Sequence, residues 1–115
     1  MSHSFKRYEV DVLERLLSEH YTREQLMELL NCAEPQKTEY TGYGFFVTVA
    51  NPAIGSERRV CSDPSLVAEC GDRTAGFVVF LEDGQLTLET FPPEGESLSA
   101  DFREREVTIV APPTI

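Results

Sequence analysis

The sequence predicts an α+β fold, in which an N-terminal helical hairpin packs on one face of an antiparallel sheet of four or five strands. Apolar residues recur with the 3.6-residue period of a helix in the first third of the chain, and with the two-residue period of a strand after Pro35. Because helices precede strands, the strand–helix alternation of a parallel sheet is absent. With 115 residues we expect one domain over 1–115: a helical hairpin at 3–34, the sheet at 38–110 and a frayed tail at 111–115.

Two amphipathic helices account for the first third of the chain. The apolar stripe of the first helix consists of Phe5, Tyr8, Val12, Leu13, Leu16 and Leu17, and the residues off this stripe are Glu9, Asp11, Glu14 and Arg15. The second helix has a clear start, because Thr22 is a favourable N-cap and Gln25 can complete a capping box. Asn31 and then Pro35 supply its stop.

The strongest strand signal is a hairpin over 77–91. Its turn is Asp83-Gly84, a favoured pair because both residues tolerate a positive φ. A two-residue turn places Leu81 opposite Leu86 and fixes the register of the whole hairpin. The first strand is apolar on both faces and should therefore be central in the sheet. Further strands are expected at 43–50, 58–61 and about 102–110, whereas 66–70 fits either a strand or a helical turn.

The charge balance excludes several kinds of partner. The chain has 20 acidic and 10 basic side chains, so its net charge is −10. Such a surface disfavours nucleic acid and anionic membranes, which both need a basic face. The segment 82–106 holds eight acids and two bases, and hence −6 of the total. Either these acids only keep the domain soluble, or they form a surface for a basic partner.

The sequence shows no signal peptide and no group of residues typical of a catalytic site. The N-terminus has no apolar run that would make it a signal peptide, and three cysteines are a poor disulfide framework, so we expect a cytoplasmic protein. We predict no catalytic residue, no metal site and no cofactor, because His3 and His20 are the only histidines and suit an exposed surface. Gly42 and Gly44 lead into a strand and not a helix, which favours a β-bulge or a close backbone approach by a neighbouring element over a phosphate-binding loop.

The leading hypothesis is a non-catalytic acidic interaction domain, immunity-like or regulatory, that binds a protein partner, with a basic one fitting the charge best. Its candidate partner-binding residues are Glu82, Asp83, Glu89, Glu94 and Glu96. The alternative is a small-molecule-binding domain with an aromatic pocket beside the sheet, lined by Tyr40, Tyr43 and Phe46. A third possibility is a homodimer in which an edge strand pairs with a second copy.

Two segments carry a resemblance. The stretch 41–46, Thr-Gly-Tyr-Gly-Phe-Phe, and the hairpin 76–89, which runs from Gly-Phe through Glu-Asp-Gly to Leu-Glu, are similar to those of a group of short, uncharacterised bacterial α+β proteins. The resemblance covers about residues 40–89 and ends there, since this chain continues with Thr90-Phe91-Pro92-Pro93 where that group often has a glycine and an aromatic residue. It implies a bacterial, cytoplasmic α+β domain and carries no activity.

Overall fold

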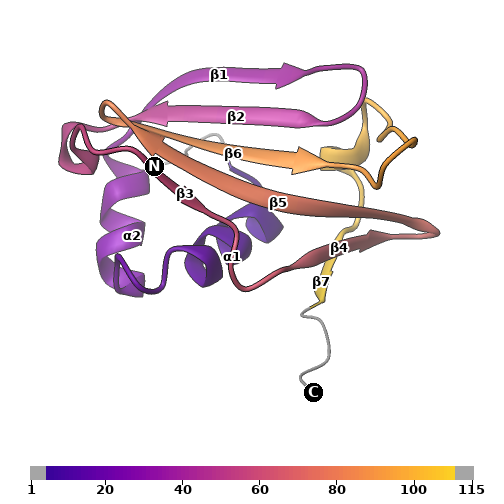
Figure 1. Ribbon diagram of the computed structural model, residues 1–115, viewed down its shortest axis with the longest axis horizontal. Helices are drawn as coiled ribbons and strands as arrows, with labels where there is room; N and C mark the ends of the chain where they lie inside the picture. Colours follow the sequence, from indigo (N-terminus) through magenta and orange to yellow (C-terminus); the bar gives the residue numbers. More distant parts are fainter. Residues whose placement is uncertain (1–4, 111–115) are drawn as a thin grey trace.

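A computed structural model describes residues 5–110 and shows an α+β fold of two helices and a seven-stranded antiparallel sheet (Figure 1). The helices are α1 (Arg7–Leu16) and α2 (Arg23–Asn31). The strands are β1 (Glu34–Tyr40), β2 (Phe45–Ala50), β3 (Arg59–Cys61), β4 (Val67–Cys70), β5 (Arg73–Glu82), β6 (Gln85–Phe91) and β7 (Thr108–Val110). Two short 3-10 helices, η1 (Pro52–Ile54) and η2 (Phe102–Glu104), complete the elements.

The sheet is organised around its longest strand, β5. The strand order is β1-β2-β6-β5-β4-β7, and β3 also pairs with β5. One side of β5 is bonded along its length by β6, whereas the other side is shared by β4 near its start and β3 near its end. The apolar strand that the sequence places in the centre is therefore flanked by strands on both sides.

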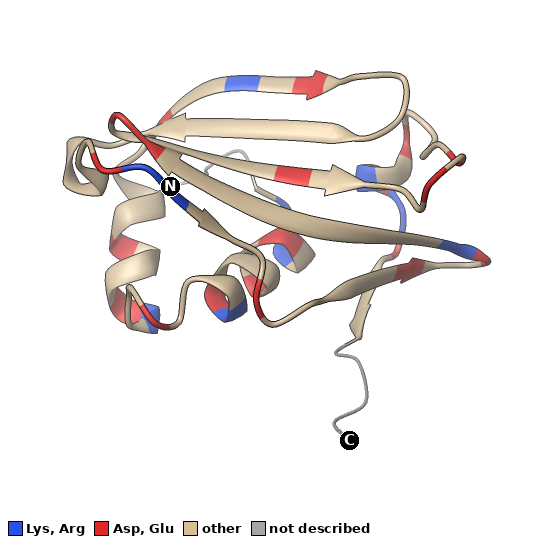
Figure 2. Cartoon of the chain, in the orientation of Figure 1, with Lys and Arg blue, Asp and Glu red and all other residues tan. Residues whose placement is uncertain are grey.

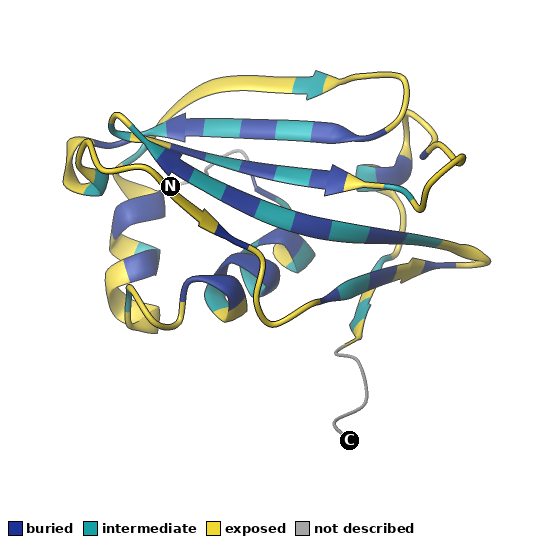
Figure 3. Cartoon of the chain, in the orientation of Figure 1, coloured by how far each residue is buried: buried dark blue, intermediate teal, exposed yellow. Residues whose placement is uncertain are grey.

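Both helices lie on the same face of the sheet, beneath it in Figure 1. The side chains of β2 and β6 alternate between buried and half-buried along each strand, as Figure 3 shows in its dark blue and teal bands. The buried set of the sheet packs against the apolar stripes of the helices to form one core, and its strand members include Phe45, Val47, Val49, Phe77, Val79, Leu81, Leu86 and Leu88. The half-buried set points to the opposite face, away from both helices.

The hairpin between β5 and β6 forms in the expected register. Leu81 pairs with Leu86, and the ladder continues without a shift from Glu82↔Gln85 to Gly76↔Phe91. Both turn residues have positive φ, 50° at Asp83 and 74° at Gly84. The N-cap of α2 is also as expected, because the Thr22 hydroxyl accepts a hydrogen bond from the backbone N–H of Gln25, and the Gln25 side chain accepts one in return.

The sheet has more strands than the four or five that we expected. The strand missing from the prediction is β1, whose sequence Glu-Pro-Gln-Lys-Thr-Glu-Tyr has no apolar alternation. It lies at the edge of the sheet with most of its residues exposed, so it needs no apolar face. The chain enters it directly after the C-cap of α2 at Cys32, and the sheet consequently starts at Glu34 and not at 38.

The C-terminal part also differs from expectation. The segment 66–70, which fitted a strand or a helical turn, contains the strand β4. The strand expected over 102–110 is limited to Thr108–Val110, because Phe102–Glu104 forms η2 and buries the ring of Phe102 in the core. The predicted tail at 111–115 and the first residues of the helical hairpin lie outside the described residues.

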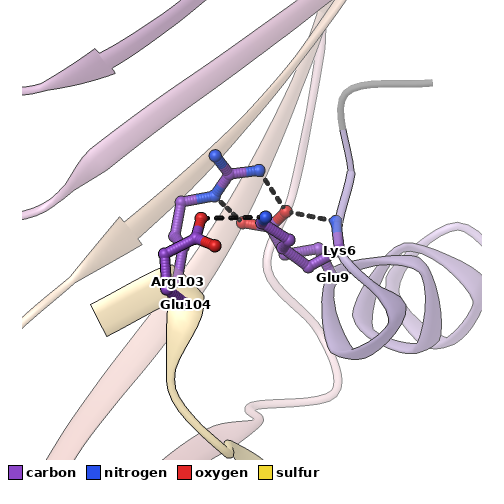
Figure 4. A network of polar contacts seen from close by, with 4 residues as sticks. All are labelled: Lys6, Glu9, Arg103 and Glu104. Carbon is purple, nitrogen blue, oxygen red and sulfur yellow. Dashed lines mark hydrogen bonds and ion pairs between the residues drawn. The ribbon is translucent and has the colours of Figure 1, made fainter. Parts of the chain in front are cut away.

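One acidic side chain is placed differently from the prediction for the first helix. Glu9, expected on the polar side, is fully buried. Its carboxylate accepts hydrogen bonds from Nε and Nη2 of Arg103 at 2.8 and 2.7 Å, and from the backbone N–H of Lys6 at 2.8 Å (Figure 4). Beside it, Lys6 forms an ion pair with Glu104 at 2.8 Å. This network joins the start of α1 to η2 across 94 residues of sequence.

The pKa of Arg103 reflects this partner. Burial of its side chain lowers the pKa, but the hydrogen bond and the charge of Glu9 raise it by more, and the net direction is upward. The guanidinium is therefore a permanent cation inside the domain. Its charge compensates that of Glu9, which a buried carboxylate requires.

Gly44 is required by the close contact between the start of β2 and the end of β6. A Cβ atom built on Gly44 would overlap the backbone carbonyl oxygen of Thr90, which belongs to the neighbouring strand and cannot turn away. The structure thus contains the close backbone approach that the glycine suggested.

We predict that Gly44→Ala lowers the free energy of unfolding by about 1–3 kcal/mol, the usual range for overpacking a tight contact. Urea unfolding followed by circular dichroism measures this change. Ser56→Ala, at an exposed loop position, is the control and should leave the midpoint unchanged. Equal stability of Gly44→Ala and wild type would show that the two strands do not approach as closely as described.

Candidate functional site

The face of the sheet turned away from the helices carries a group of apolar side chains around one carboxylate. We call this group the open face, and it consists of Phe46, Val60, Val78, Phe80, Glu89 and Phe91. Val60 and Phe91 are 48% and 39% exposed, and the other members are half-buried (Figure 3). An apolar patch left in water on a small acidic domain is typical of an interaction surface.

The register of the sheet determines which side chains are neighbours on the open face. Phe46 of β2, Glu89 of β6 and Val78 of β5 lie directly opposite one another in one row across three strands. Side chains opposed in this way have Cβ atoms about 5 Å apart. Glu89 is therefore flanked by an aromatic ring on one side and a valine on the other.

The carboxylate of Glu89 is partly desolvated and has no cation beside it. Burial among its apolar neighbours raises the pKa of Glu89 above the usual value. Within residues 5–110, no Lys, Arg or His nitrogen lies within 4 Å of this carboxylate. The arrangement is an acceptor for a positive charge that the described part of the chain does not supply.

Cations elsewhere on this side of the sheet already have partners. Lys37 forms an ion pair with Glu39 at 3.0 Å, and Arg58 forms one with Glu82 at 3.5 Å. The middle of the open face is further ordered by a hydrogen bond of 2.9 Å between the hydroxyls of Thr48 and Thr87. Glu89 is thus not neutralised by Lys37 or Arg58.

The acidic residues selected from the sequence do not gather in one patch. Glu82 and Asp83 lie at the tip of the β5–β6 hairpin, whereas Glu94 and Glu96 lie in the loop after β6, at the other end (Figure 2). The seven residues of β6 separate the two pairs by about 20 Å, at about 3.3 Å per residue. Glu89 alone lies between them, on the sheet itself.

The aromatic residues selected for a ligand pocket point in different directions. Tyr40 pairs with Phe45 in the sheet and lies on the helix side, whereas Phe46 belongs to the open face. The hydroxyl of Tyr40 donates a hydrogen bond of 2.6 Å to the backbone carbonyl of Leu98 and so attaches the loop after β6. Tyr43 is 67% exposed. Because Tyr40 and Phe46 are on opposite faces, these three residues do not line one pocket.

Groups with chemical reactivity are few in the described chain. Cys61 and Cys70 are buried, and burial raises the pKa of the Cys61 thiol, which disfavours the nucleophilic thiolate. Over residues 5–110, no group of three or more His, Cys, Asp and Glu side chains is placed to hold a metal ion. The arrangement of the open face suits binding by contact and charge.

Of the apolar members of the open face, the sequence pattern pointed to Phe46 and not to Val60, Val78, Phe80 or Phe91. Val78 and Phe80 belong to β5, whose apolar residues on both faces predict a central position in the sheet. The strand is central, but its second apolar face is uncovered by the helices. A strand of this kind, in a chain with only two helices, is the signal that points to an uncovered sheet face.

The free edge of β1 is unsuited to pairing with a second copy. Pro35 lacks an N–H group, and Lys37 and Glu39 place charges along the strand. Natural sheets use these residues to prevent edge-to-edge association. This disfavours a homodimer that pairs through β1.

A comparison of the chain with models of known protein families, with curated proteins and with solved structures found no match. Among the helices of residues 5–110, none is long and apolar enough to span a bilayer. The function is therefore inferred from the geometry described above.

We predict that Glu89→Gln gains stability relative to wild type as the pH rises. The raised pKa means that the folded state favours the protonated carboxyl of Glu89 over the ionised one. The stability that the protonated carboxyl contributes is fully present below the unfolded pKa, about 4.3, and is lost as the pH rises through the folded pKa. The glutamine side chain of the variant does not titrate and keeps its contribution. Urea unfolding of both proteins between about pH 4 and pH 7 measures the difference. A difference that does not change with pH would contradict the desolvation of Glu89.

Proposed function

We propose that this protein is a non-catalytic interaction domain whose open face binds a basic protein partner. The observation that carries the proposal is the partly desolvated carboxylate of Glu89, which lies between Phe46 and Val78 and has no ion-pair partner among residues 5–110. A partner that presents an Arg or Lys surrounded by apolar side chains complements this arrangement. Binding would exclude water from the apolar residues and give Glu89 its counter-charge.

The arrangement of charge around the open face supports a basic partner. Acidic pairs lie beyond both of its ends, Glu82 and Asp83 at the hairpin tip and Glu94 and Glu96 in the loop. Protein interfaces commonly have an apolar centre within a polar rim, and here the rim contains Asp83 and Glu94 beside the ion pairs of Glu82 with Arg58 and of Glu96 with Arg73. An acidic rim accelerates encounter with a positively charged surface and disfavours an acidic one.

A second copy of this chain fits the open face less well. A two-fold contact centred on the row of Glu89 would bring two of these carboxylates together, away from water, and each copy carries a net charge of −10. Nucleic acid and anionic membranes are disfavoured by the same charge. The favoured occupant is therefore a different protein with a cationic, apolar surface.

We predict that Glu89→Lys abolishes capture of the partner. Tagged wild-type protein and variants would be used as bait in a lysate of cells that express the native protein, with bound proteins quantified by mass spectrometry. The expected result is a basic protein that binds wild type. The amount captured should fall at least about tenfold with Glu89→Lys, and it should decrease steeply as the salt concentration rises.

The matched control is Glu24→Lys, which makes the same charge change at an exposed position on α2, on the other side of the sheet. It should retain the partner. Val78→Thr, which keeps the shape of the side chain and adds a hydroxyl, should weaken binding without loss of fold. A specific partner that Glu89→Lys and Glu24→Lys retain equally would overturn the assignment of the open face.

A further inference from the structure

A groove lies on the helix side of the molecule, between α1 and the chain segment that leads from η2 into β7. Its volume is about 860 Å³, which is within the usual range of small-molecule sites. The α1 side is formed by residues that recur every three or four positions, namely Arg7, Val10, Asp11 and Glu14. The opposite side is formed by Arg103, Arg105, Val107 and Ile109, and Arg23 borders it from the start of α2.

The groove concentrates positive charge in a strongly acidic protein. Of the ten Lys and Arg residues in the chain, five line it: Lys6, Arg7, Arg23, Arg103 and Arg105. Among the described residues, the acids that line the groove are Asp11 and Glu14, while Glu9 and Glu104 lie beside it and pair with Arg103 and Lys6. Figure 2 shows the blue segments at the start of α1 and around η2 that form this concentration. At physiological salt, charges beyond about 8 Å are screened, so a bound ligand responds to the charged groups in and beside the groove and not to the distant acids.

Two of these cations form no ion pair within residues 5–110. Lys6, Arg23 and Arg103 form ion pairs with Glu104, Glu14 and Glu9, respectively. Arg7 and Arg105 are exposed, and neither has a carboxylate within 4 Å in the described part of the chain. They approach the groove from its two sides, one from α1 and one from the segment before β7.

Both sides of the groove contribute apolar side chains. Val10, Val107 and Ile109 are half-buried hydrophobic residues that pack against the core, and the ring of Tyr8 lies beside them. Burial and the nearby Glu9 carboxylate raise the pKa of Tyr8, so its phenol is neutral and adds no negative charge to the site. A ligand here meets both apolar surface and guanidinium groups.

We propose that this groove binds a small amphipathic anion, with a carboxylate or phosphate group held by Arg7 and Arg105 and an apolar body on Val10, Val107 and Ile109. Guanidinium groups bind planar carboxylates and phosphates through paired hydrogen bonds, which suits both head groups. The site lies on the opposite side of the sheet from the open face. It does not depend on the proposed protein partner.

Titration of ¹⁵N-labelled protein with octanoate and with phenyl phosphate, followed by two-dimensional NMR, tests the proposal. Saturable shifts should be confined to the amides of α1 and β7, with a Kd on the order of 1 mM for ligands of about ten heavy atoms. Comparison of the two ligands distinguishes a carboxylate from a phosphate head group. Octanamide, which lacks the charge, and inorganic phosphate, which lacks the apolar body, should each bind at least about tenfold more weakly.

The decisive variant is Arg7→Gln/Arg105→Gln, in which both positions are exposed and the fold should be unchanged. It should weaken binding by at least about tenfold. The control Arg58→Gln/Arg73→Gln removes the same charge outside the groove and should stay within about twofold of wild type. Equal binding by the Arg7/Arg105 variant, or no saturable shift with either anion, would overturn the proposal.

Discussion

The buried ion pair between Glu9 and Arg103 is the constraint on which the arrangement of this domain depends. A carboxylate with no exposed surface is tolerated only because two N–H groups of Arg103 and one backbone N–H group donate to it. The pair joins residues at opposite ends of the described chain, so α1 and η2 are held together although 94 residues separate them. Its position also determines where the segment after η2 runs, and hence the wall of the groove beside α1.

The molecule has two surfaces of different chemistry, because α1 and α2 both pack on one side of the sheet. The helices cover one face of the sheet and leave the other to water, where Phe46, Val78 and Phe80 surround Glu89. On the covered side, the cations of α1 and of the segment before β7 meet across a groove. The net charge of −10 is the sum over the whole chain and conceals this difference between the two surfaces. We propose a different class of ligand for each of them.

Local signals predicted the elements with regular periodicity, and the features that depend on distant contacts were missed. The capping box at Thr22 and the turn at Asp83-Gly84 are defined by neighbouring residues and formed as expected. Strand β1 was missed because an exposed edge strand needs no apolar face. The burial of Glu9 depends on Arg103, which no local pattern connects to it, and the uncovered state of the open face depends on where two helices pack.

The most direct measurement of the role of the ion pair is a double-mutant cycle with Glu9→Leu and Arg103→Met, using urea unfolding. Each single change leaves one buried charge without its partner and should lower the free energy of unfolding by about 3–5 kcal/mol. The double variant replaces both charges with apolar side chains and should recover most of that loss. If the free energy of unfolding of the double variant falls by the sum of the two single decreases, Glu9 and Arg103 act independently. That result would contradict the role described for the pair.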